Sequence, residues 1–571
     1  MKTFGFTTVI NTVAKGFNHS AVAYQTSIIS DRYICLSHPN SKFPKDKLCQ
    51  ENEQYILMLD GVILNKTQLM TQAKADSWFG YLIGQYNTKG DVFFDELRGS
   101  FCGVLVDKHK DRSILFTDNI GSKFLYYSLM KDALCCSTMI AYIYRLRNAN
   151  RFDCTLSEQG ALMLLTYGFM LENYTLCEEV KKVQPGCYVV FERGKATEHR
   201  YCILDNTPDY SITEEEAIEL YDREFRRAVA IQFEKDREEY PNRPHVVALS
   251  GGLDCRMTSW VAHEMGYTNQ LNLTFSQTDY WDEMVPKQIA ADLRHEWLFK
   301  ALDNGLWLYN LDNVLEVTGG NVLYNGQAHV LSLIKYVNFN ELGGVYHSGQ
   351  LGDVVMGTHM KDNSIPFHLG IGAYSTKYLE KLSKVKLSNY PNMEIGLFYC
   401  RYFNGTNNGQ LMTMTDMETI GPHMDWDALN AILKVPASMR YNHNLYKKWI
   451  LAKYPKAADY VWETMEAKIT TPTFTIAGRA RTLGQWRNTL LNKLHLRSSD
   501  IDNKKHMNPI GYYLNTNPAL IDFINKNLAD VDCIMNNTVR NIIKDITSKG
   551  TSMEKIQATT LVRAVKMFEL K

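Results

Sequence analysis

The sequence predicts an α/β protein with a strand-rich first part and a second part built on a parallel sheet covered by helices. Short apolar segments bounded by turn residues run through residues 1–203, and apolar strands alternate with helices from about residue 210. Between these helices, an apolar strand at 246–249 breaks into a Ser-Gly-Gly turn that opens a helix. A length of 571 residues favours two or three domains.

The first part, residues 1–203, is expected to form a domain of short strands. Its clearest segments are of strand length and are bounded by Asp, Gly, Lys or Pro-Gly. They are Tyr55–Leu59, Gly103–Asp107, Ser113–Phe116 and Cys187–Phe191. The second domain is expected over residues 210–571, because a capping box of Thr213 and Glu216 starts a helix just after the polar connector 204–209.

The stretch 246–257 is the strongest chemical signal in the chain. A strand that turns through Gly251 and Gly252 into a helix brings backbone N–H groups and the positive end of the helix dipole to one point. The glycines let phosphate oxygens approach the main chain, while Ser250 offers a hydroxyl and Asp254 a carboxylate suited to Mg²⁺. The pattern predicts a binding site for the pyrophosphate group of a nucleotide.

The rest of the second domain continues the alternation of strand and helix. A strand is expected at 270–275, followed by a helix through residues 284–293. Such alternation predicts a parallel sheet with its ligand at the carboxyl ends of the strands. After about residue 392 the chain is expected to be mostly helical, with a helical C-terminal extension from about residue 480 that includes the amphipathic segments 520–528 and 556–568.

Composition argues against several classes of partner. Lys plus Arg and Asp plus Glu both number 62, so there is no excess of positive charge for a nucleic acid. The longest apolar run, 161–171, falls short of the roughly 20 residues of a membrane span, and the first residues lack an apolar signal core. Twelve cysteines without a regular framework suit reduced thiols, which predicts a cytoplasmic protein.

The Ser-Gly-Gly-x-Asp turn at 250–254 resembles the pyrophosphate loop of N-type ATP pyrophosphatases, and about 500 residues of the chain resemble the asparagine synthetase family in collinear order. The segments that carry this resemblance are 115–127, the Pro-Gly turn in 184–186, Tyr280–Glu283, His347–Asp353, Glu418–Asp425 and Glu466–Lys468 with Pro472. The resemblance implies an N-terminal Ntn-hydrolase-like αββα sandwich, then an α/β pyrophosphate-loop synthetase domain of the adenine nucleotide α-hydrolase type with a helical C-terminal part.

The same resemblance implies which residues bind ATP and Mg²⁺. Asp254 and Asp353 would hold the metal, and Lys468 would place a fixed positive charge against the α-phosphate or pyrophosphate. The nucleotide would contact backbone groups of two leucines, the turn itself and the segment after a later strand. These residues are Leu249, Ser250, Gly251, Gly252, Cys255, Leu273, Ser348 and Gly349. Cys255 stands where the family has serine, and it is a weaker hydrogen-bond donor.

Two differences from the family's residue pattern predict that the N-terminal domain does not hydrolyse glutamine. Glutaminases of the family carry a cysteine directly after the initiator methionine, whereas this chain has Lys2. The family's Asn-Gly pair at the oxyanion site is Asp60-Gly61 here, and a carboxylate repels developing negative charge. The domain is then expected to persist as a structural partner of the synthetase domain.

The nitrogen would therefore come from free ammonia, a partner glutaminase or an amine of the substrate. β-Lactam synthetases and lasso-peptide cyclases, which resemble the same family, also lack the cysteine and use an amine already present on the substrate. Gln350 stands where asparagine synthetases have glutamate, and an amide cannot take a proton. The hypothesis from the sequence is that Glu418 acts as the base while Gln350 orients the amine.

These features predict an ATP- and Mg²⁺-dependent ligase that adenylates a small-molecule or peptide carboxylate, releases pyrophosphate and joins the acyl group to an amine or ammonia. Asparagine formation from aspartate is the alternative within this class. Lys2, Asp60, Cys255 and Gln350 together keep open a degenerate member that binds nucleotide without turnover. Sulfur transfer to tRNA would require paired cysteines and a basic face, and neither is evident. The sequence leaves open whether the chain forms a homodimer or binds a partner protein.

Overall fold

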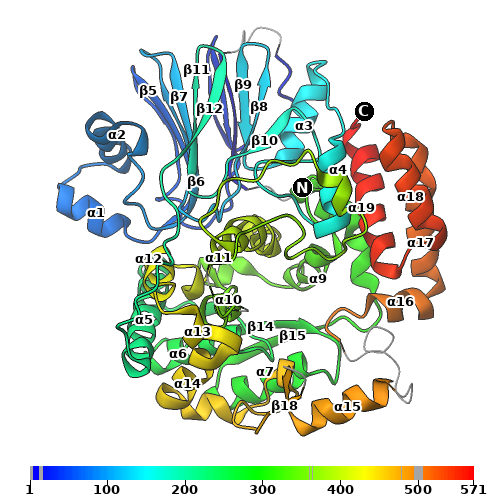
Figure 1. Cartoon of the computed structure of the whole chain (residues 1–571). Coiled ribbons are helices and arrows are strands. Elements are labelled where there is room, and N and C mark those ends of the chain that lie inside the picture. Colours follow the sequence, from blue (N-terminus) through cyan, green and yellow to red (C-terminus); the bar gives the residue numbers. More distant parts are fainter. Residues whose placement is uncertain (1–3, 12–16, 359, 363, 477–478, 494–505) are drawn as a thin grey trace.

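The computed structural model describes residues 4–11, 17–358, 360–362, 364–476, 479–493 and 506–571. Figure 1 shows two stacked sheets from the first third of the chain above a smaller sheet surrounded by helices. No helix within these ranges is both long and apolar enough to cross a bilayer.

The two upper sheets each have six strands. The first runs in the order β10 (Val180–Lys182), β8 (Tyr126–Met130), β9 (Ala133–Ser137), β1 (Phe6–Ile10), β3 (Tyr33–Ser37) and β2 (Thr26–Ile29). The second runs in the order β12 (Lys195–Arg200), β11 (Cys187–Glu192), β7 (Arg112–Thr117), β6 (Gly99–Asp107), β5 (Tyr55–Ile63) and β4 (Leu48–Glu51). Every pairing within both sheets is antiparallel.

Strand β5 shows why these segments read as continuous apolar runs. Ile56 and Met58 face the core between the two sheets, whereas Leu57 and Leu59 face a second core that contains helix α2 (Trp78–Lys89). Alternate residues of a strand point to opposite faces, so a strand covered on both faces is apolar throughout. The first sheet is covered in turn by α3 (Ile140–Ala149) and α4 (Glu158–Tyr167), which gives the expected αββα layers.

The second part begins at α5 (Glu214–Glu239), which carries the predicted capping box. Its sheet is wholly parallel, in the order β15 (Glu296–Ala301), β14 (Gln270–Ser276), β13 (His245–Ala248), β16 (Val345–His347) and β17 (Glu418–Ile420). The connecting helices are α6 (Leu253–Glu264), α7 (Trp281–Leu293), α8 (Leu311–Thr318), α9 (Asn325–Ile334) and α10 (Gly352–Met356). The parallel sheet expected from the alternation is therefore present.

The remaining chain is mostly helical. After β17 come α12 (Trp426–Ile432), α13 (Ala437–Arg440) and α14 (Asn444–Lys453), then the hairpin β18 (Phe474–Ile476) and β19 (Arg479–Arg481). The last helices are α15 (Leu483–Lys493), α16 (Ile510–Thr516), α17 (Pro518–Leu528), α18 (Asn537–Lys549) and α19 (Ser552–Phe568). Helix α19 returns to the first part of the chain, where the N–H of Lys571 donates to the carbonyl of Cys154 at 2.8 Å.

Candidate active site

A crevice opens where the strand order of the parallel sheet reverses. The chain runs outward from β13 through β14 to β15, and it then continues with β16 on the other side of β13. The loops that follow β13 and β16 therefore leave the sheet side by side at its carboxyl edge. In open parallel sheets, this is where ligands bind.

The loop after β13 holds the predicted glycine turn. Gly252 is the extended N-cap residue of α6, and no side chain caps this helix. The N–H of Gly252 donates to the hydroxyl of Ser250 at 3.3 Å, and the N–H of Gly251 donates to Oδ1 of Asp282 at 2.8 Å. The positive end of the α6 dipole thus points at the crevice.

Two glycines in the loop after β16 let that loop lie against the first turn of α6. A Cβ at Gly349 would stand 2.3 Å from the backbone nitrogen of Cys255, and one at Gly352 would stand 2.5 Å from Oδ1 of Asp254. Neither distance is compatible with a side chain. The approach brings the N–H of Asp353 to Oδ2 of Asp254 at 3.0 Å.

Asp254 and Asp353 line one side of a cavity of about 410 Å³, here called the carboxylate cavity. Its other lining residues are Ser250, Gly252, Leu253, Cys255, Gly349, Gln350, His443, Tyr446, Trp462 and Thr464. Burial, together with the nearby charge of Asp353, raises the pKa of Asp254 well above its ordinary value. Two carboxylates that repel each other at one point form a donor set suited to a divalent cation.

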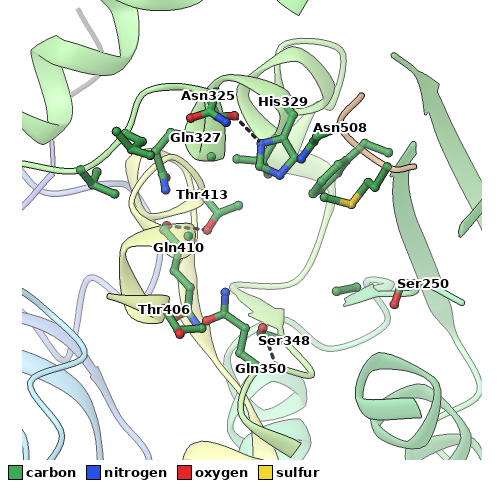
Figure 2. Close-up of a pocket in the computed structure, with 18 of the residues that line it drawn as sticks. Ser250, Asn325, Gln327, His329, Ser348, Gln350, Thr406, Gln410, Thr413 and Asn508 are labelled. Carbon is green, nitrogen blue, oxygen red and sulfur yellow. Dashed lines mark hydrogen bonds between the residues drawn. The ribbon is translucent and has the colours of Figure 1, made fainter. Parts of the chain in front are cut away.

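A second cavity of about 580 Å³ lies beside the first and is here called the amide cavity. Figure 2 shows polar side chains from α9, from the segment η6 (Thr406–Gln410) and from the loops after β13 and β16 directed toward this space. Ser250, Cys255 and Gln350 line both cavities. The two cavities therefore meet at the glycine turn.

The predicted nucleotide contacts fall on these walls, with one qualification for the leucines. Leu249, Leu273 and Ser348 line the amide cavity. The N–H of Leu249 donates to the carbonyl of Leu273 at 3.1 Å, and the carbonyl of Leu249 accepts from Thr274 at 2.8 Å. These backbone groups are thus bonded within the sheet. Gly251 is the one residue of the turn outside both linings, and its N–H donates to Asp282.

The structure does not bring Glu418 to either cavity. It begins β17 and pairs with Val345 at the start of β16, so it lies at the opposite end of these strands from the crevice. Its buried carboxylate forms ion pairs at 2.8 and 2.9 Å with the ammonium groups of Lys47 and Lys123, which also face Asp60. The hypothesis that Glu418 is the base is therefore corrected: it belongs to a buried ionic cluster with the first part of the chain.

Lys468 is also not among the residues that line the carboxylate cavity. A short turn pairs Trp462 with Ala467 and places Lys468 on the outside, where its ammonium lies 3.5 Å from Asp459. Its side chain is 51% exposed. Trp462 and Thr464 of the same turn line the cavity in its place.

Asp282 is a site residue that the sequence reasoning quoted without assigning a role. It lies in the first turn of α7, lines the amide cavity and fixes Gly251. Burial raises the pKa of Asp282 to about 6. Its place two residues after Tyr280 in a segment already matched to the family could have identified it.

Replacing Asp282 with Asn is expected to raise the thermal midpoint by a few degrees at pH 7.5 and by about half as much at pH 5. The pKa of Asp282 is higher in the folded than in the unfolded state, so burying its charged form lowers the stability of the protein. This loss grows as the pH rises from about 4 to about 6. Asparagine removes this cost and can still accept from Gly251. Thermal unfolding without divalent cations measures the effect, and an equal shift at both pH values would contradict it.

Comparison with known proteins gives partial similarities. Residues 40–202 match the family model described as a glutamine amidotransferase domain. The chain is 23% identical over 281 residues to asparagine synthetase [glutamine-hydrolyzing] 1 of Bacillus subtilis, which covers 47% of this chain and 42% of the relative. It is 27% identical over 177 residues to amidase chyE of Penicillium rubens, and this match covers 30% of this chain and 24% of the relative. The chain thus spans less than half the length of these curated relatives.

Two solved structures give much weaker likenesses. Glutamine phosphoribosylpyrophosphate amidotransferase from B. subtilis, complexed with ADP and GMP, matches 43% of this chain and 55% of its own at 10% identity and a TM-score of 0.23. An allosteric regulatory enzyme of purine biosynthesis matches 52% of this chain and 75% of its own, at 9% identity and a TM-score of 0.24. With scores this low, neither likeness carries an inference. The sequence similarities are thus to a glutamine amidotransferase domain and to parts of an asparagine synthetase and an amidase.

Proposed function

We propose that the protein is an ATP- and Mg²⁺-dependent amide synthetase that forms AMP and pyrophosphate. A carboxylate of the substrate attacks the α-phosphate of ATP and pyrophosphate leaves. An amine or ammonia then attacks the acyl carbon of the adenylate and AMP leaves. A cytoplasmic setting suits both ATP and the twelve free cysteines.

One observation carries this proposal. Asp254 and Asp353 follow two neighbouring parallel strands and both line the carboxylate cavity beside a glycine turn, where that cavity adjoins a second cavity large enough for a ligand. Such a cavity volume falls within the roughly 300–1,000 Å³ of small-molecule sites. The turn would hold phosphate oxygens and the amide cavity would hold the nucleoside and the substrate.

The residues present fit a magnesium ion. Asp254 and Asp353 would bind it through their oxygens, since Mg²⁺ prefers one or two carboxylates together with phosphate oxygens. The ion would neutralise charge on the departing pyrophosphate. No Lys or Arg is among the described residues that line the carboxylate cavity, so no side chain of this lining would supply the positive charge in place of the ion.

The amine is proposed to come from outside the N-terminal domain. Asp60 pairs with Lys123, which is fully buried, and its second oxygen lies 3.7 Å from Lys47, so its carboxylate is fixed in an ionic cluster. Lys2 lies outside the described residues. Gln350, which lines both cavities, is retained as the group that orients the amine.

Pyrophosphate release tests the proposal. With ATP, Mg²⁺ and a panel of carboxylates, the purified chain is expected to release pyrophosphate and AMP, and glutamine alone is expected to yield no glutamate. Absence of carboxylate-dependent pyrophosphate with every acid would contradict the synthetase. Glutamate production would contradict the external source of nitrogen and leave the synthetase standing.

A further inference from the structure

The amide cavity extends well beyond the turn that it shares with the carboxylate cavity. Its walls beyond the turn come from α9 and from η6, segments about 80 residues apart in sequence. In Figure 2 Asn325 and Gln327 of α9 stand at the end of this space away from Gln350, whereas Gln410 of η6 reaches from its side to Gln350. The far end is therefore polar.

This polar end is almost uncharged. Among the described residues that line the amide cavity, only Asp282 and Arg401 carry charges at neutral pH. Asp282 accepts from Gly251 at the glycine turn, and the guanidinium of Arg401 donates to the carbonyl of Gly372. Burial lowers the pKa of His329 to about 4, so its ring is neutral at pH 7.

Several amide oxygens that line this cavity have no hydrogen-bond partner among the residues that the structure describes. They are the side-chain oxygens of Asn325, Gln327, Gln410 and Asn508. Gln327 and Gln410 are each 2% exposed, and Asn325 is 8% exposed. A buried acceptor without a partner is unfavourable, and four around one cavity indicate that a bound ligand supplies donors.

Two amide side chains of this cavity are hydrogen-bonded to each other. The side-chain N–H of Gln410 donates to Oε1 of Gln350 at 2.6 Å, and this fixes the amide of Gln350 at the junction of the two cavities. Thr413 supports Gln410 by donating to its backbone carbonyl at 2.7 Å. The amide of Gln350 is therefore held where the reacting end of a substrate would lie.

We infer that the acid activated at this site has an uncharged body that carries several N–H or O–H donors, such as a hexuronic acid or the carboxyl end of a short peptide. This inference rests on the proposed function. The ammonium group of free aspartate could donate to these amide oxygens, but it would be buried without a carboxylate to balance its charge among the residues described at this end. Neutral amides recognise neutral hydrogen-bonding groups without that cost.

A substrate panel tests the inference. Galacturonate, N-acetyl-alanyl-alanine and aspartate are compared by kcat/KM for pyrophosphate release with ATP and Mg²⁺. At least one neutral-bodied acid is expected to exceed aspartate by tenfold or more, and which of the two does so distinguishes a sugar acid from a peptide. A preference for aspartate would overturn the inference but not the synthetase, whereas inactivity with all three would count against the proposed function and the inference together.

Substitution of Gln327 tests the wall directly. Gln327→Met keeps the volume and removes the amide, so the KM for the preferred acid is expected to rise about tenfold while the KM for ATP stays unchanged. Gln232→Met is the matched control, because Gln232 is also 2% exposed with an unpartnered oxygen but lies outside the amide cavity. Equal KM values for wild type and Gln327→Met would overturn the inference.

A second variant gives a measurement that does not depend on how much of the protein folds. Gln327→Glu places a carboxylate at the far end, where it would pair with the ammonium group of aspartate. The preference for the neutral-bodied acid over aspartate is then expected to narrow. This ratio is measured on the same preparation, so a general loss of active protein does not change it, and an unchanged ratio would contradict the assignment.

Discussion

Replacing Asp254 with Asn is expected to lower ATP-dependent pyrophosphate release by at least about a hundredfold, the scale on which removal of one group that stabilises transition-state charge acts. The substitution removes one of the two carboxylates that would hold Mg²⁺. It leaves an oxygen that can still accept from the N–H of Asp353 at the same place. Steady-state rates at saturating ATP and Mg²⁺ measure the effect.

The same variant is expected to be no less stable than the wild type. Burial and Asp353 raise the pKa of Asp254, so its charged form is disfavoured in the folded state and a neutral amide relieves the repulsion. Asp132, in the exposed turn between β8 and β9, provides the control Asp132→Asn, which is expected to leave both rate and stability unchanged. Retention of full activity in Asp254→Asn would remove the proposed metal site.

Replacing Lys123 with Met is expected to destabilise the protein by about 3–5 kcal/mol, the cost of breaking a buried ion pair by removing one partner. Lys123 is fully buried and faces both Asp60 and Glu418, which would then share only Lys47. Urea unfolding at pH 7.5 measures the loss, and the exposed Lys195→Met is the control. A change of less than about 1 kcal/mol would contradict the account.

The double variant Lys123→Met with Asp60→Asn is expected to recover much of this loss, because it restores charge balance. The contribution of the Asp60–Lys123 pair to the stability of the wild type should be constant between about pH 5 and pH 9, whereas the loss in Lys123→Met should shrink at acid pH, where protonation neutralises a carboxylate left without its partner. Burial opposes both ionised forms, but Asp60 and Glu418 outweigh it and raise the pKa of Lys123, while Lys123 and Lys47 outweigh it and lower the pKa of Asp60. The contribution is therefore lost only as pH falls below the folded pKa of Asp60 or rises through that of Lys123.

The sequence was sufficient where structure is decided locally. The strand, glycine turn and helix at 246–257 and the capping box of Thr213 depend on neighbours within a few residues, and both form as expected. The meeting of Asp254 and Asp353 also follows from simple rules, since parallel strands end at one edge of a sheet.

The structure differed where distant contacts decide the position of a side chain. A match of motifs placed Glu418 near the site, but only the register of β17 against β16 shows that it lies at the far end of the strands. The sequence reasoning identified the part of the amide cavity near the glycine turn but missed Gln327, Gln410 and Asn508, because these residues come from separate segments with no shared pattern. Each of them, taken alone, reads as an ordinary polar residue.

The transfer of oxygen from the acid to AMP tests the central claim most directly. The carboxylate that supports pyrophosphate release is labelled with ¹⁸O in both oxygens, and the products are analysed by mass spectrometry. Attack of the carboxylate on the α-phosphate predicts one ¹⁸O atom in AMP and none in pyrophosphate. Unlabelled AMP, or ADP together with labelled phosphate, would show that the acid is not activated as an adenylate.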